Sequence, residues 1–378
     1  MKNIGTNFRN YSNFNINSNA KKIGLFVSTN GLSEGEYQST TYIRFLSIFN
    51  QINPNYEICI IKIDNAQEFQ LVKEDLLNDN FLFDIIIIER VAFKSNQFVR
   101  LLIEKCKLLN ISIIYETDDD LINIDDTHPH YEFYQDKRLG IEYIIQNSDA
   151  VVVSTVHLKK VLMKFNENII IIPNILTEYW NESTHNPKQD DKIRIGYMGT
   201  FSHTNDLKMI KNAILDVKKY FELKNKKIIF ELIGGTPNEL NWANRILFTS
   251  KERPYPNFVK FLKKTIKWDI AIAPLVQSNI NFSKSNLKYL EYSALGIPGV
   301  YSEIGQYKES IINEYNGLLI KNNTSEEWTE NIIKLIENKQ LQNHIVKNSR
   351  KDIQENYSIN QSVKLWETTL NKCIHVKR

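Results

Sequence analysis

Short, uninterrupted apolar runs alternate with amphipathic segments from Lys22 onward, and this alternation restricts the fold class more than any other feature. The run at 83–89 is the most apolar and holds four consecutive isoleucines after Asp84. Strands that are apolar on both faces are typical of parallel sheets covered by helices on each side. The sequence therefore predicts an α/β fold built on doubly wound parallel sheets.

The alternation occurs twice, and a chain of 378 residues is long enough for two cores. The predicted domains are residues 21–175 and 192–356, joined by a polar, aperiodic linker at 176–191. Residues 1–20 are rich in asparagine and predict a flexible tail, and 357–378 predict a last helix. The strands are expected at 23–28, 57–63, 83–89, 111–116, 150–154, 169–172, 193–199, 228–233, 270–274 and 299–302. The helices are expected at 40–52, 97–109, 156–165, 206–221 and 359–370, with further elements at 258–266 and 326–338.

Composition excludes several classes of function. A net charge of +3 is too small to indicate a nucleic-acid partner. Three scattered cysteines predict neither a disulfide framework nor a zinc site and fit a reducing cytosol. Without a signal peptide or an apolar run near ~20 residues, we expect a cytoplasmic protein. Lysines at 208–227 and 260–267 leave open a peripheral contact at the inner face of the cell membrane, against the simpler interpretation of solvated helix surfaces.

Residues 281–298 are the most informative segment for function. They predict a short helix that opens on polar residues and ends at Gly296 and Pro298. Beside an apolar stripe, the helix carries a polar stripe of Lys284, Lys288 and Glu291. Lysines near a helix N-terminus oppose the macrodipole, and a bound phosphate would remove that conflict. An ordinary amphipathic helix with a solvated charged edge is the alternative interpretation.

The flanks of this segment favour the phosphate interpretation. Apolar runs at 268–275 and 299–302 predict strands on both sides of it. A helix N-terminus between two parallel strands lies at the carboxyl edge of an open α/β sheet, where phosphorylated ligands bind.

The segment resembles the donor-site signature of glycosyltransferase family 4, in which two glutamates with seven residues between them precede a small-residue run ending in Gly-x-Pro. Glu291 matches the second glutamate and Ser-Ala-Leu-Gly-Ile-Pro follows it, whereas Ser283 stands in place of the first. The variant Lys-Ser-Asn-Leu-Lys-Tyr-Leu-Glu-Tyr is similar to a bacterial surface-glycan branch. The resemblance implies a GT-B fold, in which two Rossmann-like domains face a cleft, and a last helix that packs back on the first domain.

The resemblance also implies a nucleotide-sugar site on the second domain. Backbone N–H groups at Asn286 and Leu287 match family positions on the pyrophosphate, and Glu291 would accept from sugar or ribose hydroxyls. The residues expected to bind the donor are Gly31, Gly199, Thr200, Lys284, Ser285, Asn286, Leu287, Lys288 and Glu291. Many relatives place Arg after the glycine of the Gly199 loop and Lys five residues later, where this chain has Thr200 and Asn205. His203 in that loop is a further candidate, since a protonated imidazole donates to phosphate.

Asp118 and Asp119 are the catalytic candidates of the first domain, together with His203 of the second. The run Asp118-Asp119-Asp120 invites a metal-dependent mechanism of another fold, but the doubly wound pattern on both sides argues against it. One carboxylate would orient the acceptor hydroxyl or stabilise positive charge at the anomeric carbon. For these aspartates a capped turn is the structural alternative. His128 and His130 flank Pro129 and are of a residue type that binds metals, and an ordinary loop is the alternative interpretation there.

We therefore expect a metal-independent glycosyltransferase without a cofactor, of the EC 2.4 type. It would transfer a hexose or deoxyhexose from a nucleoside diphosphate to a glycan, a lipid-linked sugar or a protein, with the retention that family 4 implies. The absent first glutamate and cation pair keep a non-catalytic subunit that binds a partner transferase or glycan as the alternative. A sugar-nucleotide epimerase is a third hypothesis, and the oligomeric state stays open.

Overall fold

The computed structural model describes residues 8–11, 19–29, 32, 36–126, 128–180, 190–234 and 240–375. The chain forms two compact units, the first made of Met1–Thr177 with Ile359–Arg378 and the second of Glu178–Ser358. Each unit contains one sheet whose strand pairs are all parallel. The α/β fold class with two parallel-sheet domains is therefore confirmed.

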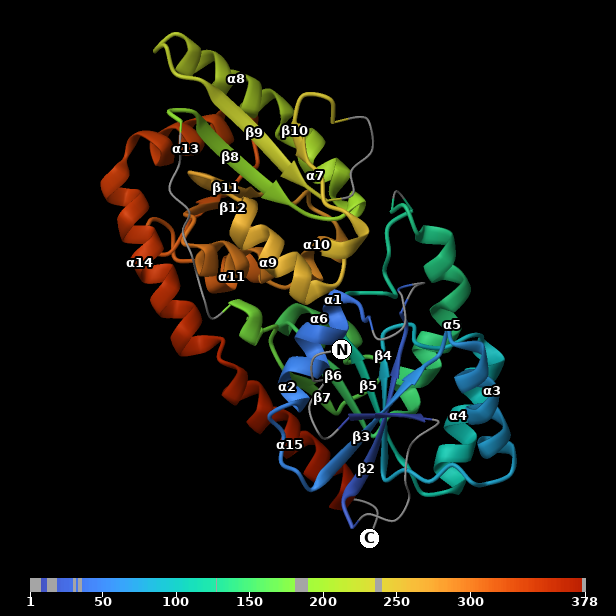
Figure 1. The fold of residues 1–378 in the computed structure, drawn as a ribbon. Helices are drawn as coiled ribbons and strands as arrows, with labels where there is room; N and C mark the ends of the chain where they lie inside the picture. The colour runs from blue at the N-terminus through green and yellow to red at the C-terminus, as the bar shows by residue number, and fades with distance from the viewer. Residues whose placement is uncertain are drawn as a thin grey trace. The chain divides into compact units, whose positions relative to one another are not determined.

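The sheet of the first unit has seven strands in the order β1-β3-β2-β4-β5-β6-β7 (Figure 1). Its strands are β1 (Phe8–Asn10), β2 (Lys21–Val27), β3 (Tyr56–Lys62), β4 (Ile85–Glu89), β5 (Ser112–Thr117), β6 (Ala150–Val153) and β7 (Ile169–Ile171). β2 lies between β3 and β4, so the strand order reverses there. A reversal of this kind opens a crevice at the carboxyl ends of the two strands.

Helices cover both faces of this sheet. They are α1 (Ser39–Thr41), the π-helical turn η2 (Tyr42–Leu46) and α2 (Ser47–Phe49), which run on from one another, then α3 (Ala66–Leu77), α4 (Asn96–Leu108), α5 (Tyr131–Asn147) and α6 (Val156–Leu162). The consecutive isoleucines of β4 alternate between two cores: Ile86 and Ile88 join the core with α4, and Ile85 and Ile87 join the core with α2. This alternation explains why the strand has to be apolar at every position.

The C-terminal helix α15 (Ile359–His375) is part of the first unit. Trp366 is fully buried, with its ring centroid 5.5 Å from that of Phe45 and 5.1 Å from that of Phe49. Figure 1 shows α15 in dark red beside α2. None of the described helices is both long enough and apolar enough to cross a membrane.

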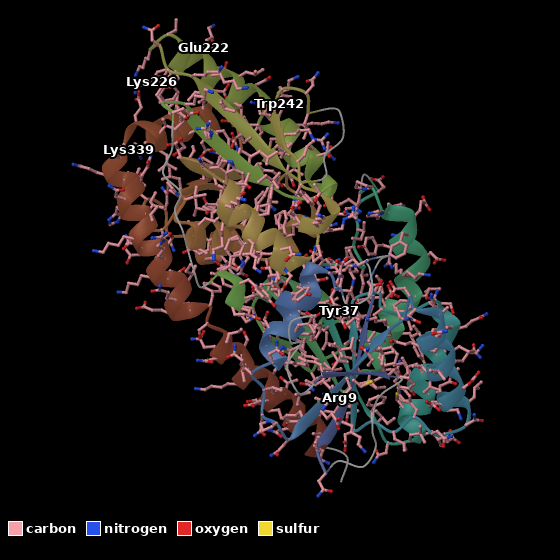
Figure 2. All side chains as sticks on the ribbon, viewed as in Figure 1. Arg9, Tyr37, Glu222, Lys226, Trp242 and Lys339 are labelled. Carbon is pink, nitrogen blue, oxygen red and sulfur yellow. The ribbon has the colours of Figure 1, made fainter. Side chains whose placement is uncertain are left out.

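The polar composition of residues 1–20 predicts a flexible tail, but Phe8–Asn10 form the edge strand β1, parallel to β3. Phe8 is buried in the core with α2, and Arg9, labelled in Figure 2, lies 3.8 Å from Glu57. Burial of Phe8 stabilises this short strand at the edge of the sheet. A single apolar residue does not stand out in a segment rich in asparagine. For these residues the tail prediction is wrong.

The sheet of the second unit has six strands in the order β10-β9-β8-β11-β12-β13. Its strands are β8 (Ile193–Met198), β9 (Ile228–Ile233), β10 (Asn244–Ile246), β11 (Ile270–Ala273), β12 (Gly299–Ser302) and β13 (Leu318–Ile320). Its α-helices are α7 (Thr204–Met209), α8 (Lys211–Glu222), α9 (Tyr255–Thr265), α10 (Asn279–Ser283), α11 (Leu287–Leu295), α12 (Gln306–Ser310), α13 (Ser325–Glu337) and α14 (Lys339–Asn356). Short 3-10 turns occur at η3 (Glu178–Trp180), η4 (Phe201–His203) and η5 (Ser250–Glu252).

The helix predicted at 206–221 is two helices, α7 and α8, with a junction at Ile210. α7 begins one turn after β8 and carries Asp206 in its first turn, where the buried carboxylate accepts hydrogen bonds from other loops. The break therefore separates a short helix at the carboxyl edge of the sheet from the longer helix that packs on its face.

Candidate functional site

The 281–298 segment contains two helices rather than the single predicted helix. Ser278 caps α10 by accepting a hydrogen bond from the Asn281 backbone N–H, and Lys284 is extended, with φ −62° and ψ 143°. α11 then begins at Leu287 and ends at Gly296, which is left-handed with φ 70°. Lys284 thus precedes the helix that carries Lys288 and Glu291, and the predicted C-terminal stop is where glycine is needed.

The two lysines converge on His203. Lys284 Nζ lies 3.1 Å and Lys288 Nζ 3.4 Å from His203 Nε2. Lys288 Nζ also lies 5.4 Å from the centroid of the Tyr197 ring, a cation–π contact at the end of β8. We call His203, Lys284 and Lys288 the His–Lys cluster; loops after β8 and β11, neighbouring parallel strands, bring it together at the carboxyl edge of the second sheet.

Asp206 contacts the other ring nitrogen of His203. Its Oδ2 lies 2.7 Å from His203 Nδ1, and its Oδ1 accepts hydrogen bonds from the Val276 N–H at 2.7 Å and the Asn281 side-chain amide at 3.0 Å. Asp206 is 2% exposed, and burial raises its pKa, opposed by the hydrogen bond from Val276 and by the charges of Lys284 and Lys288. This buried carboxylate joins the loop after β8 to the loop after β11 and so fixes the position of His203.

The N-terminus of α11 presents unused donors beside the His–Lys cluster. Within the described residues, the backbone N–H groups of Asn286 and Leu287 donate to no acceptor, as first-turn amides of a helix do without a cap. The Asn286 side chain does not cap the helix either, because its amide donates to Ser310 and Tyr357. Ser285, half-buried, completes the bend between the two lysines.

Glu291 lies one turn beyond Lys288 on α11 and is 8% exposed. Burial raises the pKa of its carboxyl to about 8, and the charge of Lys288 opposes the rise. No described residue donates a hydrogen bond to this carboxyl group. A buried carboxyl group without a donor is costly unless a ligand hydroxyl supplies one.

Gly199 begins the loop after β8, and its backbone packs closely against that of Gly234. The backbone oxygen of Gly199 would lie 1.9 Å from a Cβ at Gly234, whose φ is +118°. Thr200 is exposed and its hydroxyl pairs with Ser202 at 2.8 Å, so it points to its own loop. The predicted residue Gly31 lies outside the described residues.

Asp118 and Asp119 lie in the other unit, directly after β5. Both carboxylates accept hydrogen bonds from the Arg90 guanidinium, that of Asp119 at 2.8 Å. Asp120 is buried and accepts from Ile122, Asn123 and the Asn123 side chain, as expected for a turn. In the part of the chain that the structure describes, no three His, Cys, Asp or Glu side chains form a group that could hold a metal ion.

The structure reveals a buried polar cluster in the first unit that sequence reasoning missed. Glu89 and Glu116 pair across β4 and β5 at the carboxyl edge, near the reversal of strand order. Thr41 donates to Glu89, while Arg44 Nε lies 2.6 Å from Glu116 Oε1. Burial raises the pKa of Glu89 to about 8 and that of Glu116 to about 7, against the lowering effect of Arg44 on the latter. In the sequence, the feature that indicates this cluster is a glutamate at the end of each of the apolar runs 83–89 and 111–116.

The Glu89 carboxyl makes stability depend on pH. A folded pKa of about 8, above the ordinary 4.5, means that folding takes up a proton, so this contribution is present below about pH 4.5 and lost as pH rises through 8. We expect Glu89→Gln to leave the free energy of unfolding nearly unchanged at pH 5 and to raise it at pH 8, by at most about 1.4 kcal/mol per pH unit between them. Denaturant unfolding from pH 5 to pH 8 measures this. The exposed Glu104→Gln should show no such trend, and parallel curves for Glu89→Gln and the unaltered chain would contradict the assignment.

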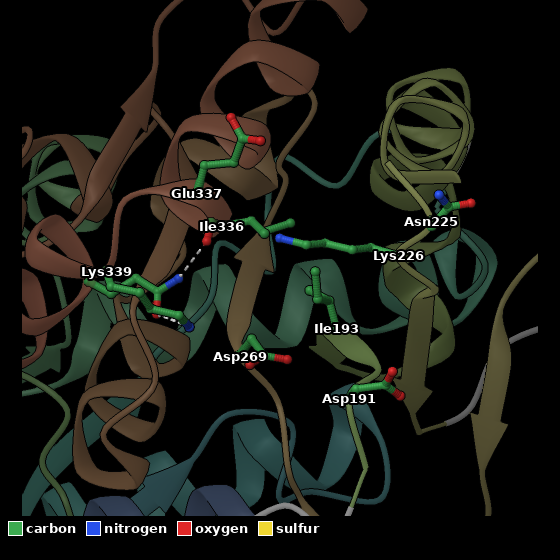
Figure 3. A pocket seen from close by; sticks show the side chains of 9 residues that line it. Asp191, Ile193, Asn225, Lys226, Asp269, Ile336, Glu337 and Lys339 are labelled. Atoms are coloured by element: carbon green, nitrogen blue, oxygen red, sulfur yellow. Dashed lines mark hydrogen bonds between the residues drawn. The ribbon is translucent and has the colours of Figure 1, made fainter. Parts of the chain in front are cut away.

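A pocket of about 480 Å³ lies elsewhere on the second unit (Figure 3). Its lining includes Ile193 at the start of β8, Asp269 just before β11, and Lys226 before β9, all at the amino edge of the sheet. None of the predicted site residues lines it. Since ligands of open α/β sheets bind at the carboxyl edge, the His–Lys cluster is the better candidate.

The second unit also matches a known family by sequence. The family model described as glycosyl transferases group 1 matches residues 178–352, which lie within the second unit. Over 315 residues the chain is 25% identical to MJ1069, an uncharacterised glycosyltransferase of Methanocaldococcus jannaschii, covering 78% of this chain and 76% of that protein.

Two solved structures share the whole fold. The crystal structure of Anabaena Alr3699/HepE in complex with UDP-glucose aligns with a TM-score of 0.63 at 11% identity, covering 93% of this chain and 99% of that one. A glycosyltransferase from Rickettsia africae aligns with a TM-score of 0.61 at 15% identity, covering 94% and 99%. The chain therefore has a GT-B fold, and the match of its second unit to the group 1 model, with the similarity to MJ1069, identifies it as a glycosyltransferase.

Proposed function

We propose that the protein transfers a hexose or deoxyhexose from a nucleoside-diphosphate sugar to a glycan, a lipid-linked sugar or a protein. The reaction proceeds with retention at the anomeric carbon, as the resemblance to family 4 and its surface-glycan branch suggests. The donor binds the second unit, and neither a metal nor another cofactor takes part. The complex of Anabaena HepE with UDP-glucose supports a donor of this class.

The convergence of the His–Lys cluster on the N-terminus of α11 carries the proposal. Two ammonium groups lie within 3.4 Å of one imidazole nitrogen, next to backbone N–H groups without acceptors. Like charges gathered at the positive end of a helix are unfavourable until an anion joins them. A diphosphate accepts from the lysines and from the amides of Asn286 and Leu287 together.

In this proposal Lys284 and Lys288 replace the Arg and Lys that many relatives carry and this chain lacks. When the bond between the anomeric carbon and the phosphate oxygen breaks, the nucleoside diphosphate leaves with the electron pair and gains negative charge. Fixed cations at that position stabilise the transition state more than the ground state. Lys284 and Lys288 supply these charges, and buried Glu291 accepts hydroxyl groups of the donor.

Asp118 and Asp119 are proposed for the acceptor side. Arg90 fixes both carboxylates after β5, which gives them a set orientation. One of them accepts a hydrogen bond from the acceptor hydroxyl and takes its proton as the hydroxyl oxygen forms the new bond to the anomeric carbon.

A thermal-shift screen tests the proposal. One of UDP, GDP, ADP or dTDP, each with its sugar conjugates, should raise the melting temperature by about 5 °C at a hundredfold excess over its Kd. The shift should be the same in EDTA and in magnesium, since lysines rather than a metal neutralise the diphosphate. No shift with any of the four would contradict a nucleotide-sugar donor, and a shift that needs magnesium would contradict the metal-independent site.

A further inference from the structure

We propose that His203 takes up a proton when the diphosphate of the donor binds, and that Asp206 is the positioning residue that prepares it to do so. The inference rests on the proposed function and adds to it a proton whose uptake follows the negative charge of the bound group. Donor binding is then coupled to pH through one side chain of the His–Lys cluster.

The hydrogen bonds of Asp206 fix the tautomer of the imidazole. The Asp206 carboxylate accepts from Val276 and Asn281 through Oδ1, so Oδ2 is left to accept as well. The group 2.7 Å away, His203 Nδ1, must then carry a hydrogen. His203 is 6% exposed, so this bond is sheltered from water and holds the ring in place.

The other nitrogen faces two cations. Lysine ammonium groups only donate hydrogen bonds, and Lys284 Nζ lies 3.1 Å from His203 Nε2. Nε2 therefore accepts through its lone pair, and the imidazole is neutral before the donor binds. A proton on Nε2 would place a third positive charge against Lys284 and Lys288, which costs energy in a partly buried site.

A bound diphosphate reverses this preference. Its oxygens accept from both ammonium groups and bring at least two negative charges to a site with one carboxylate, Asp206, in contact with the ring. Nε2 can then gain a proton and donate to a phosphate oxygen. The Tyr197 ring at the end of β8 also faces the imidazole, with ring centroids 6.2 Å apart. Among the titratable groups of the surrounding elements, Tyr307 on α12 interacts with Asp206, and Glu291 on α11 interacts with Lys288.

The charge of the ligand sets the extent of uptake. A nucleoside diphosphate carries more negative charge than its sugar conjugate, so the product should draw the proton more completely than the donor. The same difference applies to the transition state, where the leaving diphosphate gains charge. A proton on Nε2 then stabilises the transition state more than the ground state.

Isothermal titration calorimetry with UDP, or whichever diphosphate the thermal-shift screen selects, tests the inference. Titrations at pH 8 in HEPES, Tricine and Tris give the number of protons bound, because each buffer releases a different heat when it supplies a proton. The unaltered protein should take up close to one proton per diphosphate and fewer with the sugar conjugate. His203→Asn, which keeps an amide donor near Asp206 but has no second nitrogen, should bind about tenfold more weakly with uptake near zero.

The control and the contradicting outcomes are distinct. His344→Asn removes an exposed histidine on α14 and should leave both affinity and uptake unchanged. Diphosphate binding without proton uptake in the unaltered protein overturns the inference and leaves the proposed function standing. Uptake that persists in His203→Asn assigns the proton to another group, such as Glu291, and also overturns it. Failure of every nucleotide to bind contradicts the proposed function instead.

Discussion

Lys284→Ala and Lys288→Ala are each expected to weaken nucleoside-diphosphate binding by about 10- to 100-fold. A hydrogen bond to a charged group contributes about 1.5–3 kcal/mol, and each lysine is placed to make at least one with the diphosphate. Transfer should suffer more than binding, because the leaving diphosphate is more negative than the bound sugar nucleotide. Calorimetry of diphosphate binding and the steady-state rate of diphosphate release measure the two effects.

The matched control is Lys334→Ala. Lys334 is an exposed lysine of the same unit that also has a partner, Glu314, at 2.6 Å. Its loss should change neither affinity nor rate, because an exposed ion pair contributes little to stability and lies outside the His–Lys cluster. Melting temperatures near that of the unaltered chain would show that all three variants fold. Unchanged diphosphate affinity in both Lys284→Ala and Lys288→Ala would refute the anion site.

The sequence predicts the sheets because their strands are apolar on both faces, as β4 shows with its four isoleucines. The elements that the sequence does not predict contain too few apolar residues to form a recognisable pattern. β10 and β13 have three residues each, too few for a period, and α14 buries only Gln342, Ile345, Ser349 and Ile353 over 18 residues. The stability of such elements comes from packing against the rest of the unit rather than from their own pattern.

For the site, the sequence predicts candidate residues but not their mutual contacts. Lys284, Lys288 and His203 are all predicted, yet 81 positions separate His203 from Lys284, and the pairing of β8 with β11 brings their loops together. In the sequence, Asp206 is one acidic residue of a predicted helix. Its role follows only from the hydrogen bonds that the structure shows. The roles of the predicted residues stay predictions, which the substitutions above address.

Arg44→Met is expected to destabilise the first unit by about 3–5 kcal/mol, the cost of breaking a buried ion pair by removing one partner. Arg44 is 1% exposed, and its Nη1 also donates to the Ile172 carbonyl at 2.6 Å and to Asn174 at 2.9 Å. Methionine keeps the length of the stem but leaves the Glu116 carboxyl buried without its cation. Chemical denaturation followed by tryptophan fluorescence, to which Trp366 contributes from the same unit, measures the loss.

The pH dependence of that loss separates charge from packing. Glu116 has a raised pKa of about 7, so its carboxyl is mostly neutral at pH 5 and mostly ionised at pH 8. The deficit of Arg44→Met should therefore be smaller at pH 5, and Arg44→Met with Glu116→Leu should recover much of the stability at pH 8 because no uncompensated charge remains. Lys105→Ala, which removes one partner of a more exposed pair with Asp79, should cost about 1 kcal/mol or less at either pH. An equal deficit at both pH values, with no recovery in the double variant, would mean that Arg44 acts through packing and its backbone hydrogen bond alone.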